Sequence, residues 1–412
     1  MRQAFYIKNI ISSFNSPLSK VRWDYVKKTL ISVFLVGLLG VVSALMLNYI
    51  DRTKTPTNIT TEPISININK DMSLAKTFDI YLKVVVIRDG HIIDTRMDYK
   101  DPILRNFYVL MYNYFLGGRA AGKPMNYVDD NGYAHYYMDT ESGTVNPQYI
   151  GIAIGNGTAP VIPTNAKLYE VYKSTTSVDE EPGENSTHMW INYTATFYID
   201  TAINISEAGL FIDSLDSYIY GSESPVRVYI TRDLIDPPVE LQADDYLIIT
   251  YTIYAKKSGN FVENFFTLIH NYLLRNQTYQ MADYNDTSGV QHFYVDTESG
   301  GYNPVAYIQL GNNTTGFDFY RYNLTSPIAI EKANVRYEDH TPDNITVCIS
   351  ALFTFTEDYN ISEIGVVLRL DSDSSSNIAY TDVLILYIPL TTPIGVTAGQ
   401  QLSFKVTITL SF

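Results

Sequence analysis

The sequence predicts a mainly β protein, with two tandem Ig-like β-sandwich domains that each carry one short amphipathic helix, plus an N-terminal transmembrane helix. Three observations support this fold class. One long stretch occurs twice in the 412 residues, at an offset that falls from 158 to 156. Both copies consist mostly of short β-branched and aromatic runs separated by polar turns, as in β-sandwiches. A run of 21 residues without a charge, 30–50, precedes both copies.

The N-terminal segment divides at residue 30. Residues 1–29 form a basic segment, and residues 30–50 are long enough to cross a bilayer as one helix. Because basic residues flank the cytoplasmic side of such helices, we expect the N-terminus in the cytoplasm and the rest outside. The alternative is a cleaved signal sequence, for which Val42-Ser43-Ala44 offers small residues at the cleavage point. Both alternatives export the remaining chain, to a cell surface, a secreted form or a virion surface.

The charge distribution bears on partners. Residues 1–50 carry a net charge of +5 and the remainder −20, which together give the −15 of the whole chain. An exported region this acidic lacks the basic footprint that phosphates require, so nucleic acid is excluded as a partner. The expected partners are the membrane, through residues 30–50, and further copies of the chain. The single cysteine, Cys348, cannot form an intramolecular disulfide, and we expect it to be a small buried residue.

Residues 51–77 are predicted to be a stalk, because their first part is rich in threonine and proline. The first sandwich domain is predicted at 78–256. Its opening run, Phe78–Ile87, is followed by Asp89-Gly90 and a second β-rich run, the pattern of a two-residue hairpin.

A short helix should follow the hairpin. Apolar residues recur with helical spacing from Phe107 to Tyr114, and the second copy repeats them from Phe265 to Tyr272. Asp101-Pro102 is predicted to supply the N-cap and first helical position, and Gly117 to end the helix. We expect each helix to cover the end of a β core.

The second domain is predicted at 257–412, entered directly from the strand that ends the first. Three segments resemble one another, Asp79–Ile87, Asp245–Ile253 and Leu402–Leu410, although only two domains are present. One strand is therefore surplus, and its edge can pair with a neighbouring copy. Such a contact is heterologous and builds filaments. The alternative is a monomeric stalk in which this strand pairs within its own domain.

The most distinctive repeated motif is His135–Gly143, HYYMDTESG, which returns as His292–Gly300, HFYVDTESG. Alternate residues of a strand share a face, so its carboxylates could hold Ca²⁺. The alternative is a turn whose side chains bond its own backbone amides, and in that case no cofactor is expected. The candidate metal ligands are Asp129, Asp139, Glu141, Asp286, Asp296 and Glu298.

The same carboxylates admit a second hypothesis, a carbohydrate-active enzyme that uses paired acids. Catalytic pairs normally come from different strands, whereas these lie two residues apart. The sequence also lacks a Gly-x-Ser-x-Gly elbow and a phosphate-binding loop. We therefore expect no enzymatic activity and no catalytic residues.

Asn-x-Ser/Thr sequons are abundant after the apolar run. Their number in an exported chain predicts glycans on exposed loops. The candidate glycosylation sites are Asn58, Asn156, Asn185, Asn192, Asn204, Asn276, Asn285, Asn312, Asn313, Asn323, Asn344 and Asn360.

Two motifs carry a resemblance to known surface proteins. Gly155-Asn-Gly-Thr158 and Ile205–Phe211, followed by a terminal strand after Asp236-Pro237, resemble a pattern in phage tail-fibre and other virion surface proteins. The pattern also resembles archaeal surface filament subunits built from β-sandwiches. This resemblance implies a non-enzymatic, extracellular structural or adhesive protein, a filament or fibre subunit. The alternative that it leaves open is a virion envelope or tail protein.

Overall fold

A computed structural model describes residues 64–411 of the chain, apart from several internal segments. Contacts group residues 63–412 into one compact unit, and the predicted division into domains 78–256 and 257–412 stays a prediction. No helix in the described part is long and apolar enough to cross a membrane. The predicted cytoplasmic segment 1–29 and the predicted span 30–50 lie outside the described residues. The internal segments that are not described are 74–76, 119–122, 136–148, 220–221, 258, 275–282, 293–304, 314, 342–343 and 372–379.

The protein is mainly β, as predicted. The first copy of the repeat forms a five-stranded sheet, in the order β3-β2-β12-β9-β8, and a four-stranded sheet, in the order β11-β10-β6-β7. All pairs in these sheets are antiparallel. The strands are β2 (Phe78–Arg88), β3 (His91–Asp101), β6 (Tyr149–Gly155), β7 (Val171–Thr175), β8 (Asp179–Glu184), β9 (His188–Tyr198), β10 (Ile203–Ile219), β11 (Ser222–Leu241) and β12 (Tyr246–Lys256).

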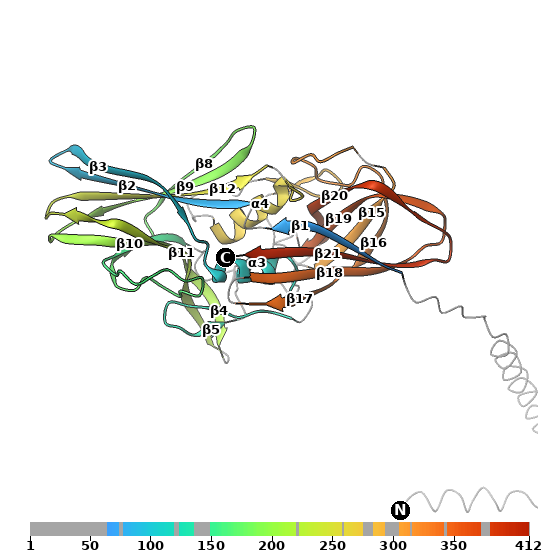
Figure 1. The fold of residues 1–412 in the computed structure, drawn as a ribbon, viewed down its shortest axis with the longest axis horizontal. Coiled ribbons are helices and arrows are strands. Elements are labelled where there is room, and N and C mark those ends of the chain that lie inside the picture. The colour runs from blue at the N-terminus through green and yellow to red at the C-terminus, as the bar shows by residue number, and fades with distance from the viewer. Residues whose placement is uncertain are drawn as a thin grey trace, which may run out of the picture. The chain divides into compact units, whose positions relative to one another are not determined.

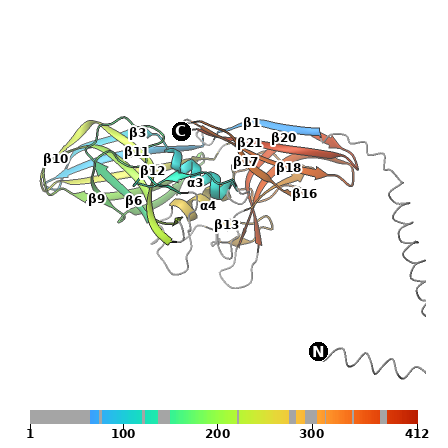
Figure 2. The same ribbon diagram turned by 90° about the horizontal axis from the view of Figure 1, so that it is seen from below.

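The second copy forms two four-stranded sheets, β1-β21-β18-β17 and β16-β15-β19-β20. Figures 1 and 2 show these sheets in orange and red, with β1 alone in blue. Their strands match those of the first copy one for one, except that β1 stands where the first copy has the β2–β3 hairpin. The strands are β1 (Ile64–Ser73), β15 (Val305–Gly311), β16 (Pro327–Lys332), β17 (Asn334–His340), β18 (Asn344–Thr354), β19 (Tyr359–Asp371), β20 (Tyr380–Val396) and β21 (Gln401–Ser411).

Strands β12 and β21 are equivalent and have the same alternation of buried and outward-facing residues. A residue with positive φ precedes each of them, Asp244 at 74° and Gly399 at 82°. This correspondence has an offset of 155, two residues away from the pairing of Asp245 with Leu402 expected from the sequence. Because side chains alternate with a period of two, both registers place the same faces inward, and the sequence pattern could not separate them.

The predicted hairpin is confirmed. Arg88 pairs with His91 across a turn in which Asp89 and Gly90 have φ of 49° and 77°. Positive φ at both central positions is what a type I′ turn requires, and Asp-Gly supplies it at low cost.

The predicted helices are present as α3 (Arg105–Phe115) and, in the second copy, α4 (Glu263–Ile269), which continues as the π-helical turn η3 (His270–Leu274). The predicted N-cap is wrong, because Asp101 belongs to β3 and Leu104, in extended conformation, precedes α3 without a side-chain cap. Gly117, with φ of 78°, follows α3 as predicted.

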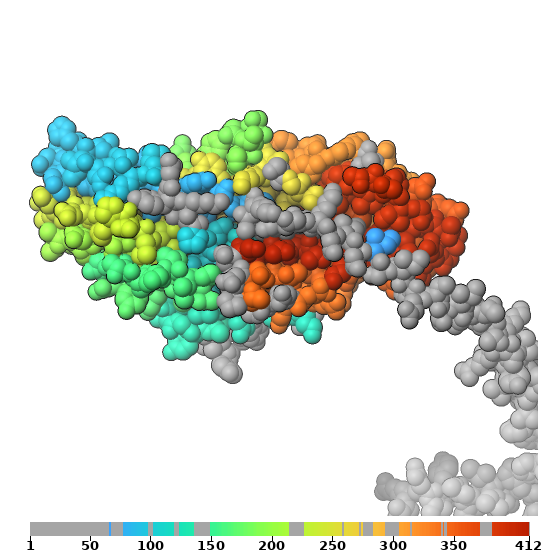
Figure 3. Space-filling model, viewed as in Figure 1, coloured from blue at the N-terminus to red at the C-terminus, as the bar shows by residue number. Residues whose placement is uncertain are grey.

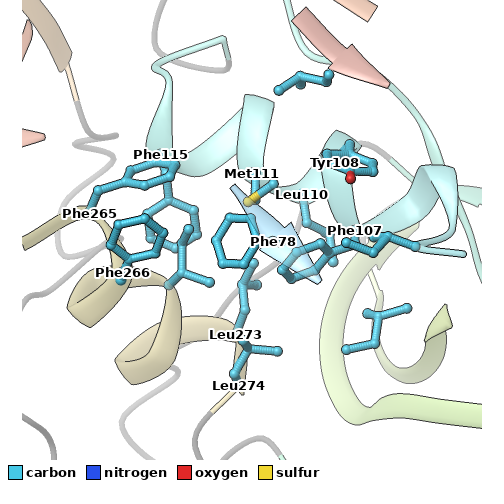
Figure 4. Close-up of a cluster of buried hydrophobic side chains, with 14 of the residues drawn as sticks. Phe78, Phe107, Tyr108, Leu110, Met111, Phe115, Phe265, Phe266, Leu273 and Leu274 are labelled. Carbon is cyan, nitrogen blue, oxygen red and sulfur yellow. The ribbon is translucent and has the colours of Figure 1, made fainter. Parts of the chain in front are cut away.

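The helices lie in the interior of the fold rather than at a solvated end. Ten consecutive residues of α3, Asn106–Phe115, are buried, so the helix has no polar outer face. Phe78 of β2 bridges the two helices, with ring centroids 6.0 Å from Phe107 and 5.3 Å from Phe266. Figure 4 shows this cluster, in which α3 and α4 face each other across Phe78. One apolar core therefore joins the two copies.

Strand β1 lies inside the predicted stalk, 51–77, where no strand was expected. It pairs in parallel with β21, from Ile64 beside Leu402 to Ser73 beside Thr409. Isoleucine at alternate positions 64, 66 and 68 gives this segment a strand pattern, which the threonine and proline before it obscure. In the space-filling view of Figure 3, β21 lies directly above β18 on the same face.

Candidate functional site

The first acidic turn is built around Asp129, between the two-residue strands β4 (Tyr127–Val128) and β5 (Ala134–His135). One oxygen of the Asp129 carboxylate accepts hydrogen bonds from the amides of Asn131, at 2.9 Å, and Tyr133, at 2.8 Å. The other oxygen lies 3.0 Å from Nε2 of His135, and both side chains are buried. Asp129 therefore closes its own turn and fixes the imidazole against it.

The second copy repeats this turn around Asp286, between β13 (Tyr284–Asn285) and β14 (Gln291–His292). Its carboxylate accepts from the amides of Ser288, at 2.8 Å, and Val290, at 2.9 Å, and lies 3.0 Å from Nε2 of His292. Burial raises the pKa of Asp286, but the hydrogen bonds from His292, Val290 and Ser288 together outweigh burial and hold the pKa below its usual value.

A stacked ring completes each turn. The Tyr127 and His135 rings lie 5.5 Å apart at 23°, and the Tyr284 and His292 rings lie 5.6 Å apart at 24°. The segment that leads into the repeated motif, 127–135 in the first copy and 284–292 in the second, is therefore the same structural element in both copies.

These turns bear on the metal hypothesis. The described candidates, Asp129 and Asp286, each bond backbone amides and a histidine. Within the part of the chain that the structure describes, no group of three or more His, Cys, Asp or Glu side chains is arranged to hold a metal ion. The other candidates, Asp139, Glu141, Asp296 and Glu298, lie outside the described residues.

Glu207 on β10 of the first copy is a carboxylate with none of its surface exposed. Its oxygens accept hydrogen bonds from the amides of Gly157, at 3.2 Å, Tyr169, at 3.0 Å, and Glu170, at 2.6 Å. Nε of Arg232, which is 1% exposed, donates to it at 2.8 Å. Glu207 thus ties the loop between β6 and β7 to β10 and β11.

Glu363 has the same role in the second copy. It is fully buried on β19 and accepts from the amides of Thr325, at 3.0 Å, and Ser326, at 2.8 Å. It stands opposite Gly311 of β15, where a Cβ atom would lie 2.3 Å from Oε1 of Glu363. Two motifs shared by both copies, the strand-ending glycine and the Ile-Ser-Glu triplet, are therefore halves of one contact.

A buried asparagine fastens each helix to the neighbouring turn. Nδ2 of Asn106 donates to the carbonyl of Val128 at 2.8 Å, and Oδ1 of Asn106 accepts from the amide of Val128 at 2.9 Å. Asn264 makes the same pair of bonds with Asn285, at 2.7 and 3.1 Å. These side chains take the place of a neighbouring strand for a short stretch of backbone.

Two buried contacts between a basic side chain and a carboxylate were not predicted from the sequence. Arg232 meets Glu207 from 25 residues away, and His270 of η3 has Nε2 2.6 Å from Oε1 of Glu180 in β8. Neither contact has a spacing signal in the sequence. The absence of Arg232 from the second copy, where Tyr387 pairs with Gly365 as Arg232 pairs with Gly209, removes the repeat signal as well.

The sequons lie at or near the surface wherever they are described. Six of their asparagines are exposed, Asn156, Asn185, Asn204, Asn312, Asn313 and Asn360, and four are half-buried, Asn192, Asn285, Asn323 and Asn344. Asn58 and Asn276 lie outside the described residues. Glycosylation of these sites stays a prediction.

No family model, curated protein or solved structure matches the chain. The resemblance to virion surface proteins and archaeal filament subunits therefore also stays a prediction.

Proposed function

We propose that this chain is a non-enzymatic structural protein of a cell or virion surface, a subunit of a filament or fibre. It consists of two tandem Ig-like sandwich domains that a membrane helix at 30–50 or a signal sequence exports. Copies of the chain join by exchanging β1. The observation that carries the proposal is the parallel pairing of β1 with β21.

Strand β1 completes the second copy from outside it. In the first copy, the strand beside β12 is β2, which is antiparallel to it and opens that copy. The described residues of the second copy include no such strand of its own, and β12 leads within seven residues to α4. Without β1, β21 would be an open edge with Leu402, Phe404 and Val406 all facing the core. Such an edge accepts a strand from any chain that supplies one.

A second copy of the chain can supply that strand with the same contacts. Exchange of an identical element replaces an internal pairing by an equal external one, so its cost in free energy is low. An exchange that does not close on itself is heterologous and produces an open filament. Only four residues, Leu74–Thr77, join β1 to β2, so a donated β1 would tie the two chains closely together.

The duplicated carboxylates favour a scaffold over a catalyst. Asp129, Asp286, Glu207 and Glu363 are buried or half-buried, and each accepts hydrogen bonds from backbone amides of its own copy. Groups held this way stabilise loops and provide no acid–base pair at an open cleft. Their presence in both copies is therefore explained by the fold that the copies share.

Electron microscopy of the purified full chain tests the proposal. We expect filaments from the wild-type protein and separate particles from an Ile66→Asp variant, since Ile66 packs against the core from β1. Ile92→Asp is the matched control, because Ile92 is 67% exposed on β3 and should leave the filaments unchanged. Wild-type protein that stays as separate particles at every concentration, or filaments that survive Ile66→Asp, would overturn the proposal.

A further inference from the structure

A second feature, independent of assembly, is a cavity of about 330 Å³ beneath the β8–β9 hairpin. Strands β8, β9 and β12 of the first copy form one wall, and α4 with η3 of the second copy forms the other. The cavity lies within the size range of small-molecule sites. Its walls are mostly apolar, with Met189, Ile191, Ile253, Ala255, Phe266 and Leu274 among the lining residues.

One ionisable pair interrupts this apolar wall. Oε1 of Glu180 lies 2.6 Å from Nε2 of His270, and both residues line the cavity. The Glu180 side chain is 1% exposed and that of His270 is 11% exposed, so the imidazole is the more accessible member. His270 also begins the π-helical turn η3, a local geometry that is frequent at functional sites. The pair gives the cavity a buried polar point, and Thr267 and Glu184 also line the cavity.

The repeat-equivalent positions show that the fold does not need this pair. Glu180 stands opposite Tyr193 in the β8–β9 ladder, and the corresponding position in the β17–β18 ladder is Val335, opposite Ile349. His270 follows Phe265 by five residues, as Tyr112 follows Phe107. The equivalent positions therefore hold valine, from the second copy, and tyrosine, from the first, where the cavity has glutamate and histidine.

Two side chains at the cavity are also smaller than those at the equivalent positions. Ala255 of β12 corresponds to Leu410 of β21, since the two follow the equivalent residues Asp244 and Gly399 by the same distance. Leu410 is fully buried, so the fold accepts leucine at this position. Tyr112 fills its own site, and its hydroxyl donates to the carbonyl of Lys123 at 2.9 Å. Alanine and histidine leave space where the equivalent positions hold leucine, from the second copy, and tyrosine, from the first.

We infer that this cavity binds a small, mostly apolar molecule, aromatic or acyl, that carries one hydroxyl group. An apolar wall penalises a charged ligand, because burial of an unpaired ion is costly. A hydroxyl both donates and accepts a hydrogen bond, so it suits either tautomer of the imidazole that Glu180 orients. Trp190 and Phe266 supply flat apolar contact for the rest of the ligand.

Calorimetric titration with 2-naphthol tests the inference. The full chain is held in lipid nanodiscs, and the heat of titrating empty nanodiscs is subtracted. We expect one 2-naphthol per chain, bound about tenfold more tightly than naphthalene, which lacks the hydroxyl, as loss of one net hydrogen bond of about 1.4 kcal/mol implies.

The matched variants introduce the residues found at the repeat-equivalent positions. Ala255→Leu should weaken 2-naphthol binding at least tenfold by filling the cavity, while exposed Thr196→Leu on β9 should not. Glu180→Val with His270→Tyr should abolish the preference for 2-naphthol over naphthalene. Circular dichroism checks that each variant is folded, and the double variant remains informative if Ala255→Leu is not. No binding to the wild-type chain, or equal binding to all folded variants, would overturn the inference.

Discussion

At the residue scale, the fold depends on carboxylates that bond backbone amides. Glu207 is the strongest example, because it satisfies loop amides and the guanidinium of Arg232 in a place that water does not reach. Removal of one member of such a pair leaves the other buried and uncompensated, which costs far more than a surface pair.

Glu207→Gln should therefore lower the free energy of unfolding by about 3–5 kcal/mol, the range for breaking a buried ion pair. Urea unfolding followed by circular dichroism measures this change. Glu240→Gln is the control, because Glu240 is exposed on β11 and its substitution should have little effect. A Glu207 variant as stable as the Glu240 variant would show that the buried contact contributes nothing.

The turn around Asp286 predicts a pH dependence. Because its pKa in the folded protein lies below the usual value, ionised Asp286 stabilises the fold above pH ~4, the pKa of an unfolded aspartate. That stability is lost as the pH falls through the folded pKa. Asp286→Asn should thus destabilise the protein by about 1–3 kcal/mol at pH 7 and by less at pH 3. The free energy of unfolding of Asp286→Asn is measured at both pH values, with exposed Asp283→Asn as the control. An equal loss of stability at pH 7 and at pH 3 would contradict the expectation.

At the element scale, the sequence predicted those features that depend on neighbouring residues. The Asp89-Gly90 hairpin has local turn chemistry, and helix α3 has a local apolar period. Features set by distant contacts could not be predicted. Asp101 has the chemistry of an N-cap, but pairing with Ile80 draws it into β3 and the helix begins later, at Arg105.

The candidate site likewise contains residues that the sequence identified and residues that it did not. The repeat identified Asp129 and Asp286, and each carboxylate bonds backbone amides of its own turn. The turn expected at 139–143 and 296–300 lies outside the described residues. The cavity pair of Glu180 and His270 is 90 residues apart, joins the two copies and is not repeated at the equivalent positions, so neither spacing nor repetition marked it. Strand β1 was missed for a further reason: a single edge strand of ten residues next to a polar segment has too weak a pattern.

The asparagines that fasten the helices give an element-scale prediction. Asn106→Ala leaves the amide and carbonyl of Val128 without their side-chain bonds, so stability should fall by about 2–3 kcal/mol. Hydrogen exchange at the Val128 amide should also accelerate, since the turn would detach from α3 before global unfolding. Exposed Asn131→Ala is the control. Unchanged exchange at Val128 would contradict the assigned role of Asn106.

At the scale of the whole molecule, assembly depends on which chain supplies β1. Intrachain and interchain pairing have the same register, so the fold of one copy is compatible with both. In either case the edge of β21, whose core-facing side chains are buried, needs a neighbouring strand. The difference appears only in the covalent connectivity of copies that have assembled.

A designed disulfide between β1 and β21 tests that connectivity most directly. Asn67 pairs with Lys405, and adjacent strands lie within disulfide reach, so Asn67→Cys with Lys405→Cys in a Cys348→Ala background places two thiols together. After oxidation of assembled protein, exchange of β1 predicts a ladder of covalent multimers on non-reducing gels. Lys405→Cys alone, in the same background, should give no ladder. A double variant that oxidises fully yet runs only as monomer would contradict the account.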